Sequence, residues 1–352
     1  MLIDILKTFI PAVIAFGTGI LITPFLTCFL YKYKAWKKNP GKQTLDWQVA
    51  VEFNRLHKER ERNIPRMGGI VIWGAALITI SSMWFLAQIW PTAATVKMDF
   101  LSRAQTWIPL FTLTFGALVG FGNDLLDIYG TGNGISLSKR LAVIVVMSSF
   151  IGWWFYEKLE IVSVGIPFAE PFEIGWLIIP FFVLVSLALY ASGIIDGIDG
   201  LSGGVFAMVF AGYAGIAFSQ SQIDLAAFSA MLAGATLAFL WFNVPPARFF
   251  MTETGTMALT LTLATVAFMT DTLGEGIGIA VLPIVGFLLA ATVATSVLQE
   301  FYKRVLGKKF FRIAPLHHHF EAIGWSGPKV AMRYWILSII FAFVGVIVAL
   351  IG

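Results

Sequence analysis

The sequence predicts an all-α polytopic membrane protein, and three observations support this fold class. Hydrophobic residues make up 58% of the chain and charged residues only 12%, whereas about a quarter of the residues in soluble domains are charged. Apolar runs long enough to cross a bilayer recur along the chain. Lys and Arg gather in alternate connections between these runs. We therefore expect a single integral membrane domain over residues 1–352.

Ten apolar segments come close to the roughly 20 residues that a helix needs to span the hydrocarbon layer. They lie near residues 8–31, 67–90, 104–122, 141–156, 174–195, 201–219, 225–242, 255–270, 276–299 and 334–351. The fifth and ninth carry no charge, which is informative because a charge at mid-bilayer costs about 2.5–3.5 kcal/mol. Pro180 and Pro283 are expected to kink these two helices. The first segment is too long for a cleavable signal peptide and is expected to remain as a helix.

The distribution of charge predicts the orientation in the membrane. Ten spans place both termini on one side, and 20 of the 24 Lys and Arg lie in the loops of the other side, ten of them in the loop 32–66. Because cytoplasmic loops carry an excess of basic residues, this basic face is predicted to be cytoplasmic and both termini periplasmic. On the periplasmic side, residues 157–175 contain two strand-like runs around a proline turn, which allow a small β-hairpin.

Each cluster with the residue types for chemistry lies on the basic face. The first, HKERERNIPRMGG (57–69), contains Arg62 and Arg66 as candidate functional residues. Its glycine pair lets the backbone approach a ligand or a neighbouring helix closely. The alternative is that these cations only set the topology and contact anionic lipid.

Paired carboxylates form the next two clusters. GFGNDLLDIYG places Asn123, Asp124 and Asp127 at the inner end of the third span, and ASGIIDGIDGLSGG places Asp196 and Asp199 after the fifth. Residues three apart share one face of a helical turn, so each pair can hold a hard cation such as Mg²⁺, or one carboxylate can act as a base that the other tunes. The alternative is a set of ordinary helix-end charges, although unpaired carboxylates beside a membrane are costly.

The fourth cluster, FNVPPARFFMTETGTMAL, connects the seventh and eighth spans and contains Asn243, Arg248 and Glu253. Pro245 and Pro246 stiffen this loop. Backbone amides at the start of the following helix would suit an anion or a metal-bound phosphate. The alternative is that Glu253 only caps that helix.

The fifth cluster, APLHHHFEAIGW, contains His317, His318 and His319, followed by Glu321. Three successive imidazoles cannot all face one way. A zinc site is disfavoured because cysteine ligands are absent and the carboxylates suit magnesium better. We expect one or two of the histidines to contact phosphate or nucleotide and a third to be satisfied structurally.

In this order, the clusters resemble the polyprenyl-phosphate N-acetylhexosamine-1-phosphate transferase superfamily, and HHHFE followed by GW and PKV resembles its phospho-N-acetylmuramoyl-pentapeptide transferase branch. PRMGG corresponds to the family's PTMGG motif, NDLLD to its paired-aspartate motif, DGIDGL to DGLDGL and MTETG to MGDTG. PLHHHFE is identical to the family's motif. The resemblance implies ten helices and transfer of phospho-MurNAc-pentapeptide from UDP to undecaprenyl phosphate. It also implies Mg²⁺ as cofactor, UMP and lipid I as products, and the bacterial inner membrane as the location, with a cytoplasmic active site.

The resemblance also implies roles for single residues. Asp124 matches a candidate base for the lipid phosphate, Glu253 a metal-ligand aspartate, and the histidines a triplet near the nucleotide-sugar phosphates. The expected catalytic residues are Asp124, Asp199 and His317. The expected substrate-binding residues are Arg62, Asn123, Asp127, Asp196, Asn243, His318 and His319. Asp199 and Glu253 are the expected metal ligands.

Four positions depart from the family's pattern. Asn123 and Glu253 replace aspartates, Gly193 replaces an asparagine, and Arg66 replaces a threonine. Asparagine can neither act as a base nor bring negative charge, whereas glutamate can still bind Mg²⁺ through a longer arm. Asp127 is a candidate to compensate, and its position matches the DDxxD form of transferases that use other N-acetylhexosamines.

Two alternatives to the muramoyl-pentapeptide transferase therefore stay open at the level of the sequence. One is a related transferase that uses UDP-GlcNAc or another UDP-N-acetylhexosamine, and the other is a non-catalytic paralogue that binds lipid phosphate. A transporter is disfavoured because the spans carry few polar residues at mid-helix. The basic loops predict no nucleic-acid partner, since their charges are juxtamembrane and spread over four segments. The expected partners are UDP-MurNAc-pentapeptide, undecaprenyl phosphate and the lipid bilayer, and the resemblance implies a homodimer.

Overall fold

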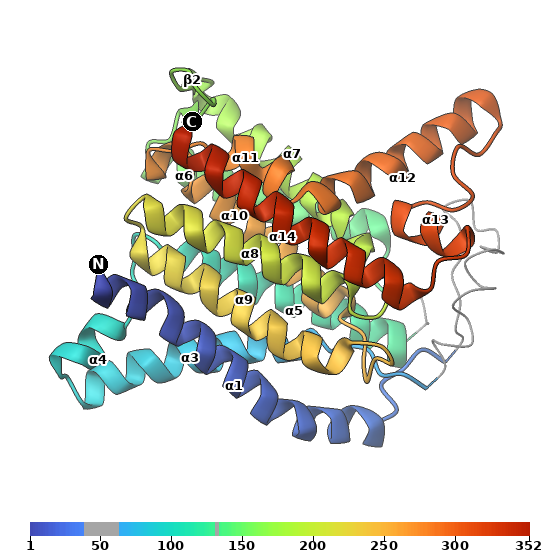
Figure 1. Ribbon diagram of the computed structural model, residues 1–352, viewed down its shortest axis with the longest axis horizontal. Helices are drawn as coiled ribbons and strands as arrows, with labels where there is room; N and C mark the ends of the chain where they lie inside the picture. Colours follow the sequence, from blue (N-terminus) through green and yellow to red (C-terminus); the bar gives the residue numbers. More distant parts are fainter. Residues whose placement is uncertain (39–62, 131–133) are drawn as a thin grey trace.

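The computed structural model describes residues 1–38, 63–130 and 134–352, and in these residues it is almost entirely helical (Figure 1). The elements of the first half are α1 (Leu2–Lys32), α3 (Ile70–Ile89), α4 (Ala93–Met98), α5 (Trp107–Tyr129), α6 (Leu137–Lys158), β1 (Ser163–Val164), β2 (Phe172–Glu173), η1 (Gly175–Leu177), α7 (Ile178–Ser192) and η2 (Gly193–Ile195). Those of the second half are α8 (Leu201–Ser219), α9 (Ile223–Asn243), α10 (Thr252–Met269), η3 (Thr272–Gly274), α11 (Gly278–Val285), α12 (Phe287–Leu306), α13 (Leu316–Ala322) and α14 (Gly327–Ile351).

Eight of the described helices are long and apolar enough to cross a membrane, and a ninth candidate is the bent pair α11 and α12. The predicted multi-span helical protein is thereby confirmed, with eight or nine candidate spans by length and composition where the sequence predicted ten. The segment that makes the difference is α10, which matches the predicted span 255–270 but carries many threonines.

Helix α10 is the centre of the protein. Nearly all of its residues are buried, and it packs against α5 and α7. Thr260, Thr262 and Thr265 each donate a hydrogen bond to the carbonyl four residues earlier in the helix. Because these hydroxyls are satisfied within the helix, a polar sequence can be buried here without leaving unpaired groups.

The two predicted proline kinks have different outcomes. Pro180 lies in the first turn of α7, where a proline is tolerated because the missing N–H has no partner in the helix, and α7 is not broken there. The described helix thus shows no break of more than 40° at Pro180, and a smaller kink there remains a prediction. The ninth predicted span is broken, with α11 and α12 meeting at 74°. Pro283 lies inside α11, and the break follows at Gly286.

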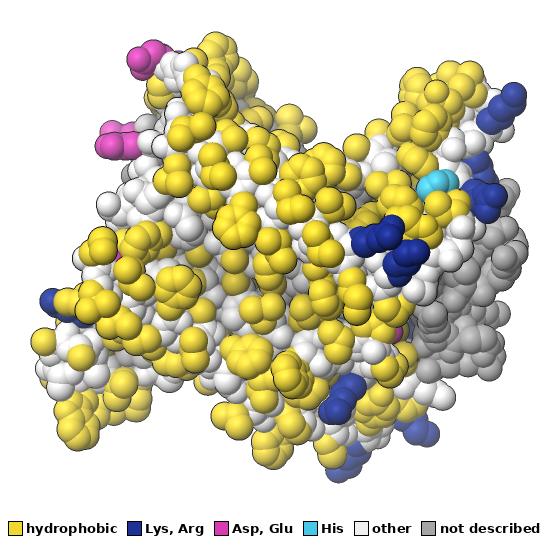
Figure 2. Space-filling view, in the orientation of Figure 1, with side chains coloured by type: hydrophobic (Ala, Val, Ile, Leu, Met, Phe, Trp, Pro, Cys, Tyr) yellow, Lys and Arg dark blue, Asp and Glu magenta, His cyan; other side chains and the backbone are white. Residues whose placement is uncertain are grey.

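Both termini lie at the same end of the helical body, and α13 lies at the opposite end (Figure 1). Most of the basic side chains in view gather near α13, and the acidic ones near the end that carries the C-terminus (Figure 2). Between α6 and α7, β1 and β2 pair antiparallel, with Ser163 opposite Glu173. The membrane side on which each end lies remains a prediction.

Candidate active site

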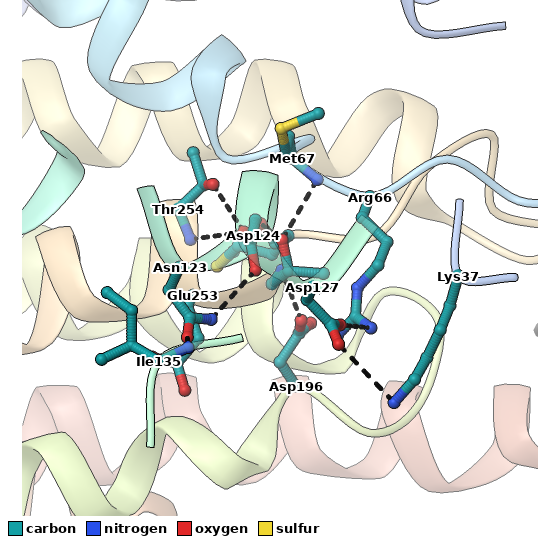
Figure 3. Close-up of polar contacts among 12 residues, drawn as sticks. Lys37, Arg66, Met67, Asn123, Asp124, Asp127, Ile135, Asp196, Glu253 and Thr254 are labelled. Carbon is teal, nitrogen blue, oxygen red and sulfur yellow. Dashed lines mark hydrogen bonds and ion pairs between the residues drawn. The ribbon is translucent and has the colours of Figure 1, made fainter. Parts of the chain in front are cut away.

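A cavity of about 610 Å³ is lined by residues from three of the five sequence clusters. Its polar lining combines carboxylates, cations and hydroxyls, namely Lys37, Arg66, Arg140, Tyr190, Asp196, Asp199, Asn243, Thr252, Glu253 and Thr256. These residues are distant in sequence and come from the segment after α1, from α6, α7, α9 and α10, and from the loops before α3 and after α7. The cavity is therefore the candidate active site, and Figure 3 shows part of its polar network.

The loop after α7 carries the cluster around Asp196 and Asp199. The helix tightens into η2 and ends at Asp196, and Gly200 then takes a left-handed φ of 78° to begin α8. Asp196 accepts hydrogen bonds from Ser202 Oγ at 2.7 Å and from the Thr252 amide at 2.8 Å. Asp199 is partly exposed, lines the cavity and accepts a bond from the Ala247 amide at 3.2 Å. Both predicted carboxylates thus reach the same cavity.

Asp124 lies behind the cavity wall. It is fully buried and is not among the residues that line the cavity. Its Oδ2 accepts hydrogen bonds from Thr252 Oγ1 and Thr254 Oγ1, each at 2.5 Å, and from the Thr254 amide at 2.9 Å. Asp124 therefore fixes the start of α10 against α5, and its role as a base remains a prediction.

The neighbours of Asp124 in the same cluster face other partners. Asn123 Oδ1 accepts a hydrogen bond from the Ile135 amide at 2.9 Å, and its Nδ2 lies 3.5 Å from Asp124 Oδ1. Asp127 forms an ion pair with Arg66 at 2.5 Å and lies 3.8 Å from Lys37 Nζ (Figure 3). Asp127 thus faces two cations that line the cavity, and its compensation for Asn123 remains a prediction.

Glu253 at the start of α10 forms an ion pair with Arg140 from α6. Tyr190 from α7 lies 3.4 Å from the same carboxylate oxygen, Oε1. The other oxygen, Oε2, is buried and has no hydrogen-bond partner among the described residues. The sequence does not single out Arg140 and Tyr190 as site residues. Arg140 is one of many basic residues that set the orientation in the membrane, and Tyr190 lies inside an apolar run.

Asn243 ties two loops of the site together. Its side-chain oxygen accepts a hydrogen bond from the Gly200 amide at 2.9 Å, and its Nδ2 donates to the Phe249 carbonyl at 2.8 Å. The residue is buried, although it contributes to the cavity lining. Both ends of the amide thus serve the protein itself, and its predicted contact with substrate remains a prediction.

Two of the three adjacent histidines lie against the Asp196–Asp199 loop. His317 and His318 are buried on α13, and His318 Nδ1 lies 2.9 Å from Glu321 Oε2. Gly197 permits this approach, because a Cβ at that position would lie 2.5 Å from His318 Nε2 and 3.0 Å from His317 Nε2. His319 turns away and accepts a bond from the Arg312 amide at 3.3 Å. The ring centroids of His317 and His318 lie 4.3 Å apart and His319 points elsewhere, so the three imidazoles do not all face one way, as the sequence predicted.

The predicted metal site fits the cavity in chemistry. In the part of the chain that the structure describes, no group of three or more His, Cys, Asp or Glu is arranged to hold a metal ion. However, Asp196, Asp199 and Glu253 all line the cavity, and Glu253 Oε2 is a buried acceptor without a partner. Oxygen ligands of this kind suit Mg²⁺ better than zinc. Arg62, the remaining predicted site residue, lies outside the described residues.

A second, apolar cavity of about 1080 Å³ lies beside the first. We call it the apolar groove, and it is bounded by the segment after β1 and by α7, α11 and α12. The bend between α11 and α12 shapes one side of it. Leu189 and Ser192 line the groove, whereas the adjacent Tyr190 and Gly193 line the polar cavity. The two cavities are thus neighbours along the end of α7.

The fold and the site define a polytopic membrane enzyme with a polar cavity beside an apolar groove. Residues 106–271 match the family described as Glycosyl transferase family 4. The chain is 30% identical over 342 residues to the phospho-N-acetylmuramoyl-pentapeptide-transferase of Shouchella clausii, with 95% of each chain covered. It is 29% identical to the enzyme of the same name from Bacillus subtilis, with 94% of each covered, and 28% identical to that of Anoxybacillus flavithermus, with 95% of each covered. The chain therefore belongs to the family of phospho-N-acetylmuramoyl-pentapeptide transferases and is a membrane transferase.

Proposed function

We propose that this protein transfers phospho-MurNAc-pentapeptide from its UDP conjugate to undecaprenyl phosphate, with Mg²⁺, at the cytoplasmic face of a bacterial inner membrane. The products would be lipid I, an intermediate of peptidoglycan synthesis, and UMP. The observation that carries this proposal is a cavity of carboxylates and cations directly beside an apolar groove. Two phosphorylated substrates, one with a long apolar tail, need both environments.

The reaction joins two phosphates. A phosphate oxygen of the lipid carrier attacks the phosphorus attached to the sugar, and a new P–O–P bond forms. The bond between that phosphorus and the bridging oxygen of UDP breaks, and its electron pair leaves with UMP. A phosphate monoester is largely dianionic near pH 7, so the attacking oxygen needs positioning and charge neutralisation more than a strong base.

The cations of the cavity suit the charge on the two substrates. Lys37, Arg66 and Arg140 all contribute to its lining. Arg66 and Arg140 are each held by a carboxylate, Asp127 and Glu253 respectively. A guanidinium fixed in this way can hold a phosphate without first being ordered, which is the basis of electrostatic preorganisation. We assign these cations to the phosphates of the donor and of the carrier.

The carboxylates of the cavity would hold magnesium. Asp199 and Glu253 are the expected ligands, and Asp196 lines the same cavity. When bound, the ion would neutralise charge on the diphosphate of the donor. Asp199 lines the cavity and is our candidate for direct contact with a substrate. His317 and His318, which contact the same loop, would lie close to the donor phosphates.

The apolar groove is our candidate for the prenyl chain of the carrier. Its lining is apolar over nearly its whole length, from Val164 and Pro167 near one end of α7 to Phe301 on α12. Ser192 lines the groove, and its neighbours Ala191 and Gly193 line the polar cavity. A carrier with its chain in the groove would present its phosphate to the cations of the cavity. This arrangement favours a lipid acceptor over a soluble one.

The identity of the sugar donor rests on similarity over the length of the chain. UDP-GlcNAc remains the competing donor, because Asn123 and Asp127 depart from the muramoyl pattern. The test is to supply purified protein in detergent with undecaprenyl phosphate, Mg²⁺ and each UDP-sugar, and to measure UMP. We expect release with UDP-MurNAc-pentapeptide, and release with UDP-GlcNAc alone would replace the proposed donor. If correctly folded protein releases no UMP with either donor, the proposed transferase activity is refuted.

Asp199→Asn tests the site. Because the substitution removes the charge of a carboxylate in the cavity, we expect turnover to fall by at least about 100-fold with an unchanged melting temperature. Asp4→Asn is the matched control, since the Asp4 side chain is 43% exposed and pairs only with the N-terminal amine in the described chain. Near-normal turnover of Asp199→Asn would show that the site is assigned wrongly.

A further inference from the structure

Thr252 has the most unusual backbone of the site. Its φ is 56°, in the left-handed region, immediately before Glu253 at the start of α10. A β-branched residue is rarely found there, because its branched Cβ crowds the backbone. Such conformations persist only when surrounding contacts enforce them, and they concentrate at functional sites. The contacts of Thr252 show what this backbone conformation provides.

Thr252 links two carboxylates that come from different parts of the chain. Its amide donates to Asp196 Oδ2 at 2.8 Å, and its hydroxyl lies 2.5 Å from Asp124 Oδ2. The hydroxyl also accepts a hydrogen bond from the Met67 amide at 3.1 Å, and the Met251 carbonyl, 2.8 Å away, is a second acceptor for its proton. Because the Asp124 oxygen is closer and charged, the hydroxyl can donate to Asp124 while it accepts from Met67. One residue thus joins α5, the loop after α7 and the segment before α3.

The left-handed backbone makes both bonds possible at once. Rotation about N–Cα sets the angle between the amide N–H and the side chain of the same residue. At the observed φ the amide reaches Asp196 while the hydroxyl reaches Asp124. Thr252 is largely buried, yet it also contributes to the cavity wall. It therefore stands between the cavity and the buried Asp124.

We propose that Thr252 is a positioning residue whose hydroxyl holds the Asp124 carboxylate in register with Asp196 and with the cavity. Thr252 occupies the place of the glycine in the MGDTG motif that MTETG resembles. Glycine adopts a left-handed φ freely but offers no hydroxyl. Asn123 also stands where the family's motif has an aspartate, so this chain has one negative charge fewer beside Asp124. The hydroxyl of Thr252 supplies Asp124 with a fixed donor in that altered setting.

This inference rests on the proposed function, and three substitutions test it. Thr252→Ser keeps the hydroxyl, Thr252→Val keeps the shape without it, and Thr252→Gly permits the backbone without it. We expect kcat of Thr252→Ser to stay within about threefold of wild type. We expect Thr252→Val and Thr252→Gly each to lower kcat by about 10- to 100-fold with little change in either KM, since small misplacements of site groups cost this much.

Thr260→Val is the matched control on the same helix, because among the described residues the Thr260 hydroxyl bonds only to carbonyls of α10. Turnover should be unaffected in that variant. The dependence of kcat on pH should shift in Thr252→Val and Thr252→Gly but not in Thr260→Val, because Asp124 loses a donor only in the first two. A purely structural role would lower the melting temperature without moving this pH profile.

Infrared difference spectra give a readout that does not need turnover. The carboxylate band of Asp124 is isolated by subtracting the spectrum of Asp124→Asn from that of wild type. Loss of the hydroxyl should shift this band in Thr252→Gly and leave it in place in Thr260→Val. An unshifted band, or wild-type kcat and pH profile in both Thr252→Val and Thr252→Gly, would overturn the inference. Wild-type protein without UMP release, but with the expected band shift, would instead refute only the proposed function.

Discussion

Arg140 and Glu253 form an ion pair across the cavity, although 113 residues separate them in sequence. The pair joins α6 to the first turn of α10 and leaves Glu253 Oε2 without a partner among the described residues. One carboxylate thus holds a guanidinium with one oxygen and keeps the other available to a cation. This pairing makes Arg140 the first residue to test beside those that the sequence pointed out.

Arg140→Gln should lower turnover by about 100-fold, because it removes a charged donor from the phosphate site. It should also destabilise the protein by about 1–2 kcal/mol. We expect less than for a fully buried pair because the two side chains are 20% and 24% exposed. UMP release and the melting temperature measure the two effects. Lys139→Ala is the control, since Lys139 is exposed beside it and lines neither cavity. Equal losses in both variants would contradict a specific role for Arg140.

Gly197→Ala should displace the histidines from the acidic loop. The added Cβ would lie 2.5 Å from His318 Nε2, which is shorter than a van der Waals contact allows. We expect turnover to fall at least about tenfold, since the groups of the site would no longer be aligned. Gly122→Ala is the matched control, because a Cβ there meets nothing within 4 Å. Wild-type activity of Gly197→Ala would show that the histidines do not need their observed place.

Asp271 should make stability depend on pH. It is buried after α10 and accepts bonds from the Gly165 amide at 2.7 Å and the Ile279 amide at 2.9 Å. Burial raises the pKa of Asp271 from 3.8 to about 6. Because the folded state holds the proton more tightly, the stabilisation is complete below about pH 3.8 and is lost as the pH rises through about 6.

The size of this effect is about 3 kcal/mol, since each pH unit between the two pKa values corresponds to about 1.4 kcal/mol. Melting temperatures at pH 4.5, 5.5 and 7 for wild type and Asp271→Asn would measure it. We expect the difference between the two proteins to change across this range. Parallel curves would show that Asp271 does not titrate in this window.

Ala188→Phe should obstruct the apolar groove, which Ala188 lines. A large side chain there would compete with a prenyl chain, so KM for the carrier should rise about tenfold while KM for the nucleotide donor stays unchanged. Leu184→Phe is the control, because Leu184 lies one turn away on α7, is 64% exposed and does not line the groove. A rise in both KM values, or in neither, would argue against the groove as the lipid site.

The sequence predicted the helical membrane fold because hydrophobic runs and the thickness of a bilayer decide it almost alone. The sequence predicted ten spans, whereas eight or nine of the described helices are long and apolar enough to cross a membrane. The helix that falls short is α10, whose many threonines lower its hydropathy. It can still be buried, because its hydroxyls bond to its own backbone. Pro180 and Pro283 differ in outcome because a proline in the first turn of a helix removes no hydrogen bond, whereas one in the interior does.

The site could be predicted in part. The polar clusters contain many of the polar residues that line the cavity, because charges beside a membrane are costly unless they are used or paired, but Arg140 and Tyr190 lie outside the clusters. Their pairing could not be predicted, since Asp127 with Arg66 and Arg140 with Glu253 depend on how distant helices pack. The two bonds of Asn243 to its neighbouring loops were hidden for the same reason.

The bend between α11 and α12 has a consequence for how a lipid acceptor would be supplied. The groove that it bounds has Val297 and Phe301 on its α12 side, and both are well exposed on the protein surface. A carrier diffusing in the plane of the membrane could then exchange sideways without passing through water. On the proposed function, the apparent affinity for the acceptor would follow its mole fraction in the bilayer and not its bulk concentration.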